Sequence, residues 1–483
     1  MKNIKSGIFK QLKSPALKKS IPFHMPGHKR NISFAPYLKE LSAKYDITEI
    51  QGYDNLQCPN GIILNAMKNA QQLWNTMHSF LLVNGSTCGI LAAINTTCQP
   101  GDKIAIARNC HKSVYNAVEL LNLKPVFIHP TVNNELHICG SIDPLELSMI
   151  INENNDIKAV VITSPTYDGV ISDISAICTI SHENNIPVII DEAHGAHLAI
   201  CEGFGLSAVK SKADIVIQSL HKTLPSLTQT AIAHICTKRI NPDRFLNSLS
   251  VFQTSSPSYL LLSSIDCCID FLIRNQEKIN NKWINSIDYI DNEIASLKNL
   301  FAFYHGTSKN RLYDSIFSYD RSKLIISVKN TKINGKQLFD ILYNDYNIVL
   351  EMYSDTYVIA MLSMCDKLSS IKRLIKALHR IDNMLDGITS HNREFTYSSS
   401  VLPEAVMRIR DAKNSKNKII NLEKSEGHIS NEFVWAYPPG IPYLIPGEII
   451  TSDIIVQIKK AIDNEIDIKS DFDHKKDEIS VIN

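Results

Sequence analysis

The sequence lacks several features that would mark particular classes of protein. Its 50 lysines and arginines nearly balance its 49 aspartates and glutamates, and the resulting net charge of +1 gives no electrostatic case for binding nucleic acid or a membrane surface. No apolar run reaches the roughly 18 residues that a membrane span needs. Residues 1–20 carry lysines but no apolar centre of the kind found in signal peptides. These absences predict a cytoplasmic protein.

The cysteines also lack a recognisable pattern. There are 11 of them, which is an odd number, and no two are spaced as C-x-x-C. Most lie inside apolar segments, where a cysteine acts as a small buried side chain in a reducing compartment. We therefore expect neither disulfides nor a zinc site, and no metal site at all.

Apolar strands alternate with helical stretches between residues 80 and 237. The seven expected strands are 80–84, 103–107, 125–129, 158–163, 187–191, 213–218 and 230–236. This alternation predicts an α/β fold with a mostly parallel seven-stranded sheet and helices on both faces. Ligands of such sheets bind at the carboxyl ends of the strands, and the polar residues of interest follow those ends.

The length of 483 residues predicts two or three domains. We expect an N-terminal arm (1–50), a large domain (51–256), a connecting helix with a small α/β domain (257–386), a polar linker (387–400) and a C-terminal domain (401–483). Within the small domain the pattern predicts strands at 322–328, 347–352 and 356–362, and helices at 335–343 and 368–385.

Lys222 follows one of the apolar strands, in Ser219-Leu-His-Lys222. An amine at the end of a buried strand costs free energy unless the protein uses it. A partly desolvated lysine can form a Schiff base with pyridoxal phosphate (PLP). A plain surface lysine is the alternative interpretation.

Asn84-Gly-Ser-Thr87 joins a strand to a helix. Gly85 permits a tight turn, and the amides and hydroxyls of Ser86 and Thr87 lie at the helix N-terminus, which together would bind a phosphate. The G-K-[ST] ending of a nucleotide-binding P-loop is missing, so a nucleoside triphosphate is not expected. A simple helix cap is the alternative.

Two further residues follow strand ends. Asp191, in Asp191-Glu-Ala-His194, could hold the protonated nitrogen of a pyridinium ring, and a metal or nucleotide-magnesium acid is the alternative. No second ligand cluster supports a metal. His111, in Asn109-Cys-His-Lys-Ser113, could stack on a flat ring or cap a helix.

Taken together, these motifs resemble the bacterial Orn/Lys/Arg decarboxylase family of fold type I PLP enzymes, whose large domain has the aspartate-aminotransferase-like fold. The short, arginine-decarboxylase-like branch is the most similar, because no N-terminal wing domain precedes His24. The motifs that carry the resemblance are His24-Met-Pro-Gly-His-Lys29, Asn84-Gly-Ser-Thr87, His111-Lys-Ser113, Asp191-Glu-Ala-His194, Ser219-Leu-His-Lys222 and Pro438-Pro-Gly-Ile-Pro442.

The resemblance implies roles for particular residues and a C-terminal decarboxylase domain. Lys222, His111 and Asp191 would be catalytic, as the Schiff-base lysine, the stacking imidazole and the partner of the ring nitrogen. Thr254 would reach the phosphate of the partner subunit in a homodimer with shared sites. The cofactor would be bound by Gly85, Ser86, Thr87, His111, Asp191, His194, Ser219, His221, Lys222 and Thr254. A departure from the family pattern is Thr223-Leu-Pro-Ser226, where glycine or alanine is commoner.

The resemblance also implies a reaction, the PLP-dependent decarboxylation of a basic amino acid in polyamine metabolism. Arginine, giving agmatine, is favoured over lysine and ornithine. A carboxylate should hold the distal cation, and Asp54, Glu351 and Glu448 are the candidates. The alternative is another PLP enzyme, an aminotransferase or a lyase. The arginines near the C-terminal end lie in helical or linker contexts, which disfavours an aminotransferase.

Overall fold

The computed structural model describes residues 7, 8, 12, 13, 42–303, 314–385, 403–436, 441–472 and 474–483. The motif at 24–29, residues 438–440 of the proline-rich motif and the predicted linker at 387–400 lie outside these residues. The chain divides into two compact units. The first comprises residues 1–97, 187–202 and 206–281, and the second comprises 98–186, 203–205 and 282–483. The domain boundaries proposed above stay a prediction.

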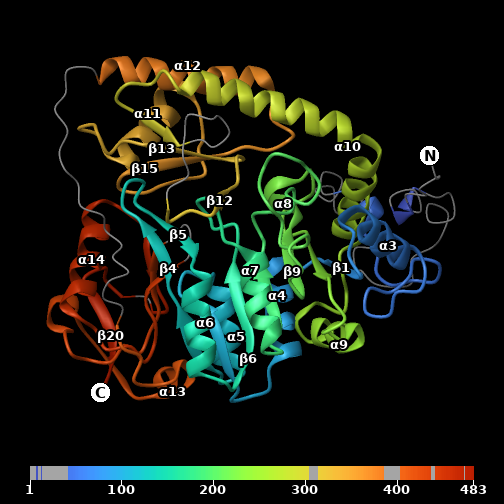
Figure 1. Cartoon of the computed structure of the whole chain (residues 1–483), viewed down its shortest axis with the longest axis horizontal. Helices are drawn as coiled ribbons and strands as arrows, with labels where there is room; N and C mark the ends of the chain where they lie inside the picture. The colour runs from blue at the N-terminus through green and yellow to red at the C-terminus, as the bar shows by residue number, and fades with distance from the viewer. Residues whose placement is uncertain are drawn as a thin grey trace. The chain divides into compact units, whose positions relative to one another are not determined.

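The main sheet has seven strands in the order β1-β10-β9-β8-β6-β2-β3. Strands β1, β6 and β9 of this sheet are labelled in Figure 1. Pairing is antiparallel for β1–β10 and β10–β9 and parallel for β9–β8, β6–β2 and β2–β3. The prediction of a mostly parallel seven-stranded sheet is therefore confirmed. The strands are β1 (His78–Leu82), β2 (Lys103–Ala107), β3 (Lys124–Ile128), β6 (Ile157–Thr163), β8 (Val188–Asp191), β9 (Ile215–Ser219) and β10 (Ala231–Ile235).

In the first unit, helix α4 (Gly85–Thr97) packs closely on the sheet. Gly89 permits this contact, because a Cβ there would come within 2.8 Å of Leu82 and 2.9 Å of Ile217. The close packing sets the N-terminus of α4 beside the end of β9. Among the described residues of this unit, the other helices that lie or begin there are η2 (Ala43–Tyr45), α3 (Ile62–Trp74), α8 (Leu220–Thr223), α9 (Pro242–Phe252) and the long α10 (Tyr259–Ile294).

The second unit contains a four-stranded antiparallel sheet in the order β11-β13-β15-β14. The strand predicted at 347–352 is wrong over most of its length, because Asn347 (φ 50°) ends α11 in the left-handed conformation and only Met352–Tyr353 form β14. The elements in this part of the chain are α5 (Lys112–Leu120), β4 (Pro130–Asn133), β5 (Ile138–Ile142), α6 (Pro144–Glu153), β7 (Val170–Ile171), α7 (Ile174–Glu183), β11 (Phe301–Phe303), β12 (Ser318–Tyr319), β13 (Lys323–Ser327), α11 (Gly335–Tyr346), β15 (Tyr357–Met361) and α12 (Leu368–Met384).

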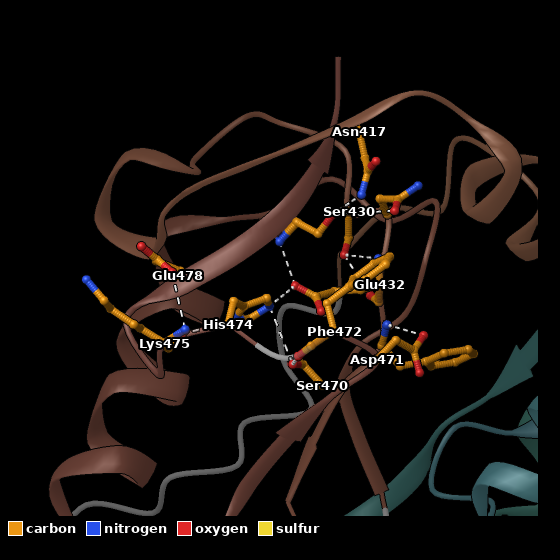
Figure 2. Close-up of polar contacts among 12 residues, drawn as sticks. Asn417, Ser430, Glu432, Ser470, Asp471, Phe472, His474, Lys475 and Glu478 are labelled. Carbon is orange, nitrogen blue, oxygen red and sulfur yellow. Dashed lines mark hydrogen bonds and ion pairs between the residues drawn. The ribbon is translucent and has the colours of Figure 1, made fainter.

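The C-terminal part of the second unit has its own apolar core, which includes Leu444, Ile450 and Val481. A buried polar cluster around Glu432 and His474 joins its strands (Figure 2). Its elements are α13 (Ile409–Asn414), β16 (Asn417–Asn421), η3 (Leu422–Lys424), β17 (Val434–Ala436), β18 (Ile441–Leu444), α14 (Ser452–Asp463), β19 (Ile468–Ser470) and β20 (Glu478–Ile482). Over the described ranges of the whole chain, we find no helix with the length and apolarity that crossing a membrane requires.

Candidate active site

Lys222 lies in the single-turn helix α8, directly after β9. Its Nζ atom is 2.9 Å from Nε2 of His194, which belongs to the loop after β8. His194 is only 5% exposed, and Lys222 is half-buried. The structure therefore brings together two of the predicted site residues, which are 28 positions apart in the chain.

The predicted phosphate-binding residues also meet at this edge of the sheet. Ser219, the last residue of β9, donates a hydrogen bond from Oγ to Oγ of Ser86 over 3.0 Å. Gly85 begins α4 with φ +74°, a conformation that favours glycine. Ser86 is half-buried and Thr87 is exposed. Both residues lie at the N-terminus of α4, and a helix N-terminus attracts anions.

Thr254 lies near the same turn of its own chain. Its backbone N–H donates to Oδ1 of Asn84 over 3.4 Å, and its Oγ1 accepts from the N–H of Ser256 over 3.1 Å. Thr254 is exposed. The prediction that it serves the partner subunit stays a prediction.

Asp191 is the last residue of β8 and is 4% exposed. Its Oδ1 accepts from the N–H of Ala193 over 3.1 Å. In the parallel pair of β8 and β9 it lies opposite Ile217, so the two side chains share the face of the sheet that α4 covers. A carboxylate and an amine thus end adjacent parallel strands at one edge.

A hydrogen bond in the structure decides which ring nitrogen of His221 carries the hydrogen, which its motif could not show. Its Nδ1 lies 2.9 Å from the carbonyl oxygen of Thr230, so Nδ1 must donate. Burial lowers the pKa of His221, the bond to Thr230 raises it, and nearby Lys222 lowers it, with a net decrease. The neutral ring then has no hydrogen on Nε2, so a direct bond from Nε2 to a phosphate would require protonation of the ring.

His111 is the N-cap residue of α5. Its Nδ1 accepts from the N–H of Ser113 over 3.2 Å and lies 2.9 Å from the Ser113 hydroxyl. The helix-capping interpretation is therefore correct for its backbone position. Its side chain is exposed, so capping leaves the ring accessible, and the stacking role stays a prediction.

Two of the three carboxylates that could bind the distal cation of the substrate already bind other groups of the protein. Asp54 accepts from the backbone N–H groups of Asn60 and Gly61 at the start of α3. Glu448 is 1% exposed and lies 3.2 Å from Arg108 through each of its oxygens. Glu351 is exposed and accepts from the hydroxyl of Tyr167 over 2.6 Å.

The residues at the carboxyl ends of β8 and β9 fit PLP by their chemistry. An amine, a buried carboxylate and a helix N-terminus with two hydroxyls match the aldehyde, the ring nitrogen and the phosphate of that molecule. Sequence reasoning missed the residues that support this edge, Glu192, Gln218 and His234. Their signal was weak, because each is a single polar residue in or beside an apolar strand.

Comparison with protein families gives two consecutive matches. Residues 6–367 match the model of the Orn/Lys/Arg decarboxylase major domain, and residues 391–465 match that of the Orn/Lys/Arg decarboxylase C-terminal domain. Over 480 residues the chain is 32% identical to an arginine decarboxylase of Bacillus subtilis, covering 98% of this chain and 97% of the relative. An arginine decarboxylase of Bacillus anthracis is 31% identical over 481 residues, covering 98% of this chain and 97% of the relative.

Solved structures show the same fold at lower identity. The lysine decarboxylase of Francisella novicida superposes with a TM-score of 0.81 at 19% identity, covering 99% of this chain and 80% of that chain. The constitutive lysine decarboxylase of Escherichia coli gives 0.82 at 18%, covering 100% and 82%. A ureidoglycine-glyoxylate aminotransferase of Bacillus subtilis gives 0.53 at 15%, covering 69% of this chain and 87% of that chain.

Proposed function

Because this chain belongs to the Orn/Lys/Arg decarboxylase family, which is PLP-dependent and of fold type I, we propose that it decarboxylates arginine to agmatine in polyamine metabolism. Lysine and ornithine are the alternatives within the family. The observation that carries the proposal is the contact of 2.9 Å between Lys222 Nζ and His194 Nε2. It lies at the end of β9, beside the hydroxyl pair of Ser86 and Ser219.

PLP supplies an aldehyde that an amine can capture and a ring that accepts the electron pair of the broken Cα–carboxylate bond. We assign Lys222 as that amine and Asp191 as the carboxylate that keeps the ring nitrogen protonated. Ser86, Thr87 and Ser219 bind the phosphate, with Gly85 permitting the close approach of the backbone. His221, held by its hydrogen bond to Thr230, would position the turn that carries Lys222 and would contribute to the surroundings of the phosphate.

His194 has a role that follows from its contact. An amine reacts as a nucleophile only after it has lost its proton, and a neutral imidazole nitrogen at 2.9 Å can accept that proton. His194 is 5% exposed, which limits exchange of this proton with water. We therefore assign His194 as the base that activates Lys222.

The role of His111 depends on the bound cofactor, and the role of Thr254 depends on a second subunit. The exposed imidazole of His111 would stack on the cofactor ring. Thr254, in an exposed turn, contributes to the phosphate site of the partner in a homodimer. Cytoplasmic location remains our expectation from the composition.

The case for arginine has two supports. Relatives that are 31–32% identical over 98% of this chain are named arginine decarboxylases. A guanidinium can also be held by a carboxylate through two parallel hydrogen bonds. The candidates for that carboxylate are Asp54, Glu351 and Glu448, of which Asp54 and Glu448 already accept hydrogen bonds that the fold needs.

The test is release of CO₂ from arginine, lysine and ornithine by the PLP-loaded protein under one set of conditions. We expect the highest kcat/KM for arginine, with a difference of about 1–3 kcal/mol for each buried hydrogen-bonding partner that lysine leaves unmatched. A preference for lysine would overturn the substrate but leave the reaction. Formation of a keto acid without CO₂ would indicate an aminotransferase and overturn the decarboxylase proposal.

A further inference from the structure

A row of buried polar side chains crosses the sheet of the first unit. Glu192 directly follows β8, Gln218 lies in β9, His234 in β10 and Ser79 in β1. Each of the four is at most 1% exposed. Buried polar groups cost free energy unless they are hydrogen-bonded, so the four side chains depend on one another. We call this row the polar relay.

The relay begins at a carboxylate that accepts three hydrogen bonds. Oε1 of Glu192 accepts from the N–H of Ala208 over 2.7 Å. Oε2 accepts from the hydroxyl of Ser207 over 3.0 Å and from Nε2 of Gln218 over 2.6 Å. Each of these three groups donates, so both oxygens of Glu192 serve as acceptors.

The hydrogen bond from Gln218 to Glu192 determines which atoms of the remaining members donate and which accept. Gln218 donates through its amide nitrogen, so its Oε1 accepts from Nε2 of His234 at 3.3 Å. Nδ1 of His234 then accepts from the hydroxyl of Ser79 at 2.8 Å. Burial lowers the pKa of His234 to about 3, which agrees with a neutral ring of this tautomer.

The relay lies on the face of the sheet opposite the candidate active site. Asp191 lies opposite Ile217 in the register of β8 and β9, and Ile217 contacts α4. Because side chains alternate along a strand, Glu192 and Gln218 point away from that face. Two of the four relay residues are nevertheless chain neighbours of site residues, Glu192 of Asp191 and Gln218 of Ser219.

Trp74 connects the relay to the loop that carries His194. Its ring lies 5.2 Å from the ring of His234, and its Nε1 donates to the carbonyl oxygen of Ala196 over 3.3 Å. The loop from Asp191 to Ala196 is therefore held at its start by Glu192 and at its end by Trp74.

We propose that Glu192 is a positioning residue for the reaction: through the polar relay it fixes the ends of β8 and β9, and so the relative placement of Asp191 and Lys222. The inference rests on the proposed function, because it assigns those two residues to PLP. Glu192 itself points to the other face of the sheet and acts only through its neighbours.

The test compares Glu192→Gln with a matched control, Asp214→Asn, in the full-length protein. Asp214 is also fully buried, and it links the opposite ends of the same two strands by accepting from the N–H of Val188 over 2.8 Å. For each variant, the dissociation constant of PLP, the pH titration of the visible absorption band and the thermal midpoint are measured. Both variants should lose thermal stability.

We expect Glu192→Gln alone to weaken PLP binding, by about tenfold, and to shift the pH titration of the absorption band. Asp214→Asn should leave both properties within about twofold of the parent protein. Equal effects of the two variants on PLP would show general destabilisation and overturn the inference. An unchanged dissociation constant and titration in Glu192→Gln would overturn it as well.

A second variant covers the case in which Glu192→Gln does not fold. Gln218→Met removes the second relay member and leaves Glu192 two of its donors, and it should shift the same two properties in the same direction. A parent-like result for a folded Gln218→Met overturns the inference. If the parent protein takes up no PLP, the proposed function itself fails, which separates the two results.

Discussion

Replacing His474 by glutamine should lower the stability of the C-terminal part at low pH and have little effect at high pH. His474 lies between two acceptors, with Nε2 2.7 Å from Oε1 of Glu432 and Nδ1 3.0 Å from the carbonyl oxygen of Lys475 (Figure 2). When Glu432 is ionised both ring nitrogens donate, which requires the charged ring. Burial raises the pKa of Glu432, and its hydrogen bonds to Ser480 and His474 lower it by less than burial raises it. Burial lowers the pKa of His474, but the bonds to Lys475 and Glu432 outweigh it and the pKa is raised.

The sign of the pH dependence follows from that raised pKa. A histidine that holds its proton more tightly in the folded state contributes stability below its unfolded pKa of about 6.5. That contribution is lost as the pH rises through the folded pKa. The groups that face the ring are Glu432, Glu478 and the hydroxyl of Ser470, and both acids favour the charged form.

The magnitude follows from what Glu432 loses. Its carboxylate is fully buried and also accepts from the N–H of Ser480 over 2.6 Å. Glutamine can replace the charged donor by a neutral one, so the loss should be about 2 kcal/mol near pH 6, within the usual range for a hydrogen bond to a charged group. Near pH 9 the difference should fall toward zero.

The assay is urea unfolding from pH 6 to pH 9, followed by tryptophan fluorescence, because Trp435 lies three residues after Glu432. The control is His379→Gln, since Nε2 of His379 meets the backbone carbonyl of Glu293 rather than a carboxylate. A difference between parent and His474→Gln that stays constant or grows with pH would refute the charged pair.

Three further predictions concern the site and another buried ion pair, Arg108–Glu448. Lys222→Ala should lose the visible absorption band of the PLP-loaded protein, and an unchanged spectrum would remove Lys222 from its role. Asp191→Ala should lower kcat by about 10²-fold or more, because the ring nitrogen loses its buried partner. Near-normal turnover would place that function on another residue. Glu448→Ala should destabilise the second unit by about 3–5 kcal/mol in urea titrations, because it leaves the buried cation of Arg108 without its carboxylate. A loss below about 1 kcal/mol would show that water reaches Arg108.

The sheet could be predicted because its strands are continuous apolar runs separated by helical segments. The hairpin of β4 and β5 escaped prediction, since Ile138-Cys-Gly-Ser-Ile142 mixes apolar and small polar residues without a clear alternation. Asn347 shows a different limit. It precedes an apolar stretch that resembles a strand, but asparagine also tolerates the left-handed conformation that ends a helix, and α11 uses it so.

The sequence could predict site residues that follow the ends of strands, because parallel strands bring their carboxyl ends to one edge of the sheet. The hydrogen of His221 could not be placed from the sequence. Its Nδ1 donates to Thr230, nine residues later, and that contact exists only because the chain turns back from β9 into antiparallel β10. The tautomer of a histidine is decided by tertiary neighbours, so a motif can locate the ring but not its proton.

Asp191 and Glu192 show why adjacent acids in one motif can have separate roles. Side chains alternate across a strand, so one carboxylate faces α4 and the other faces the polar relay. The alternation is readable in the sequence, but the partner of Glu192 is not, because Gln218 is 26 residues away and meets it only in the register Asp191↔Ile217. A shift of that register by one residue would turn Gln218 toward α4 and leave a buried carboxylate without one of its donors. The cost of such an unmatched charge selects the one pairing of β8 and β9 that also places Lys222 beside His194.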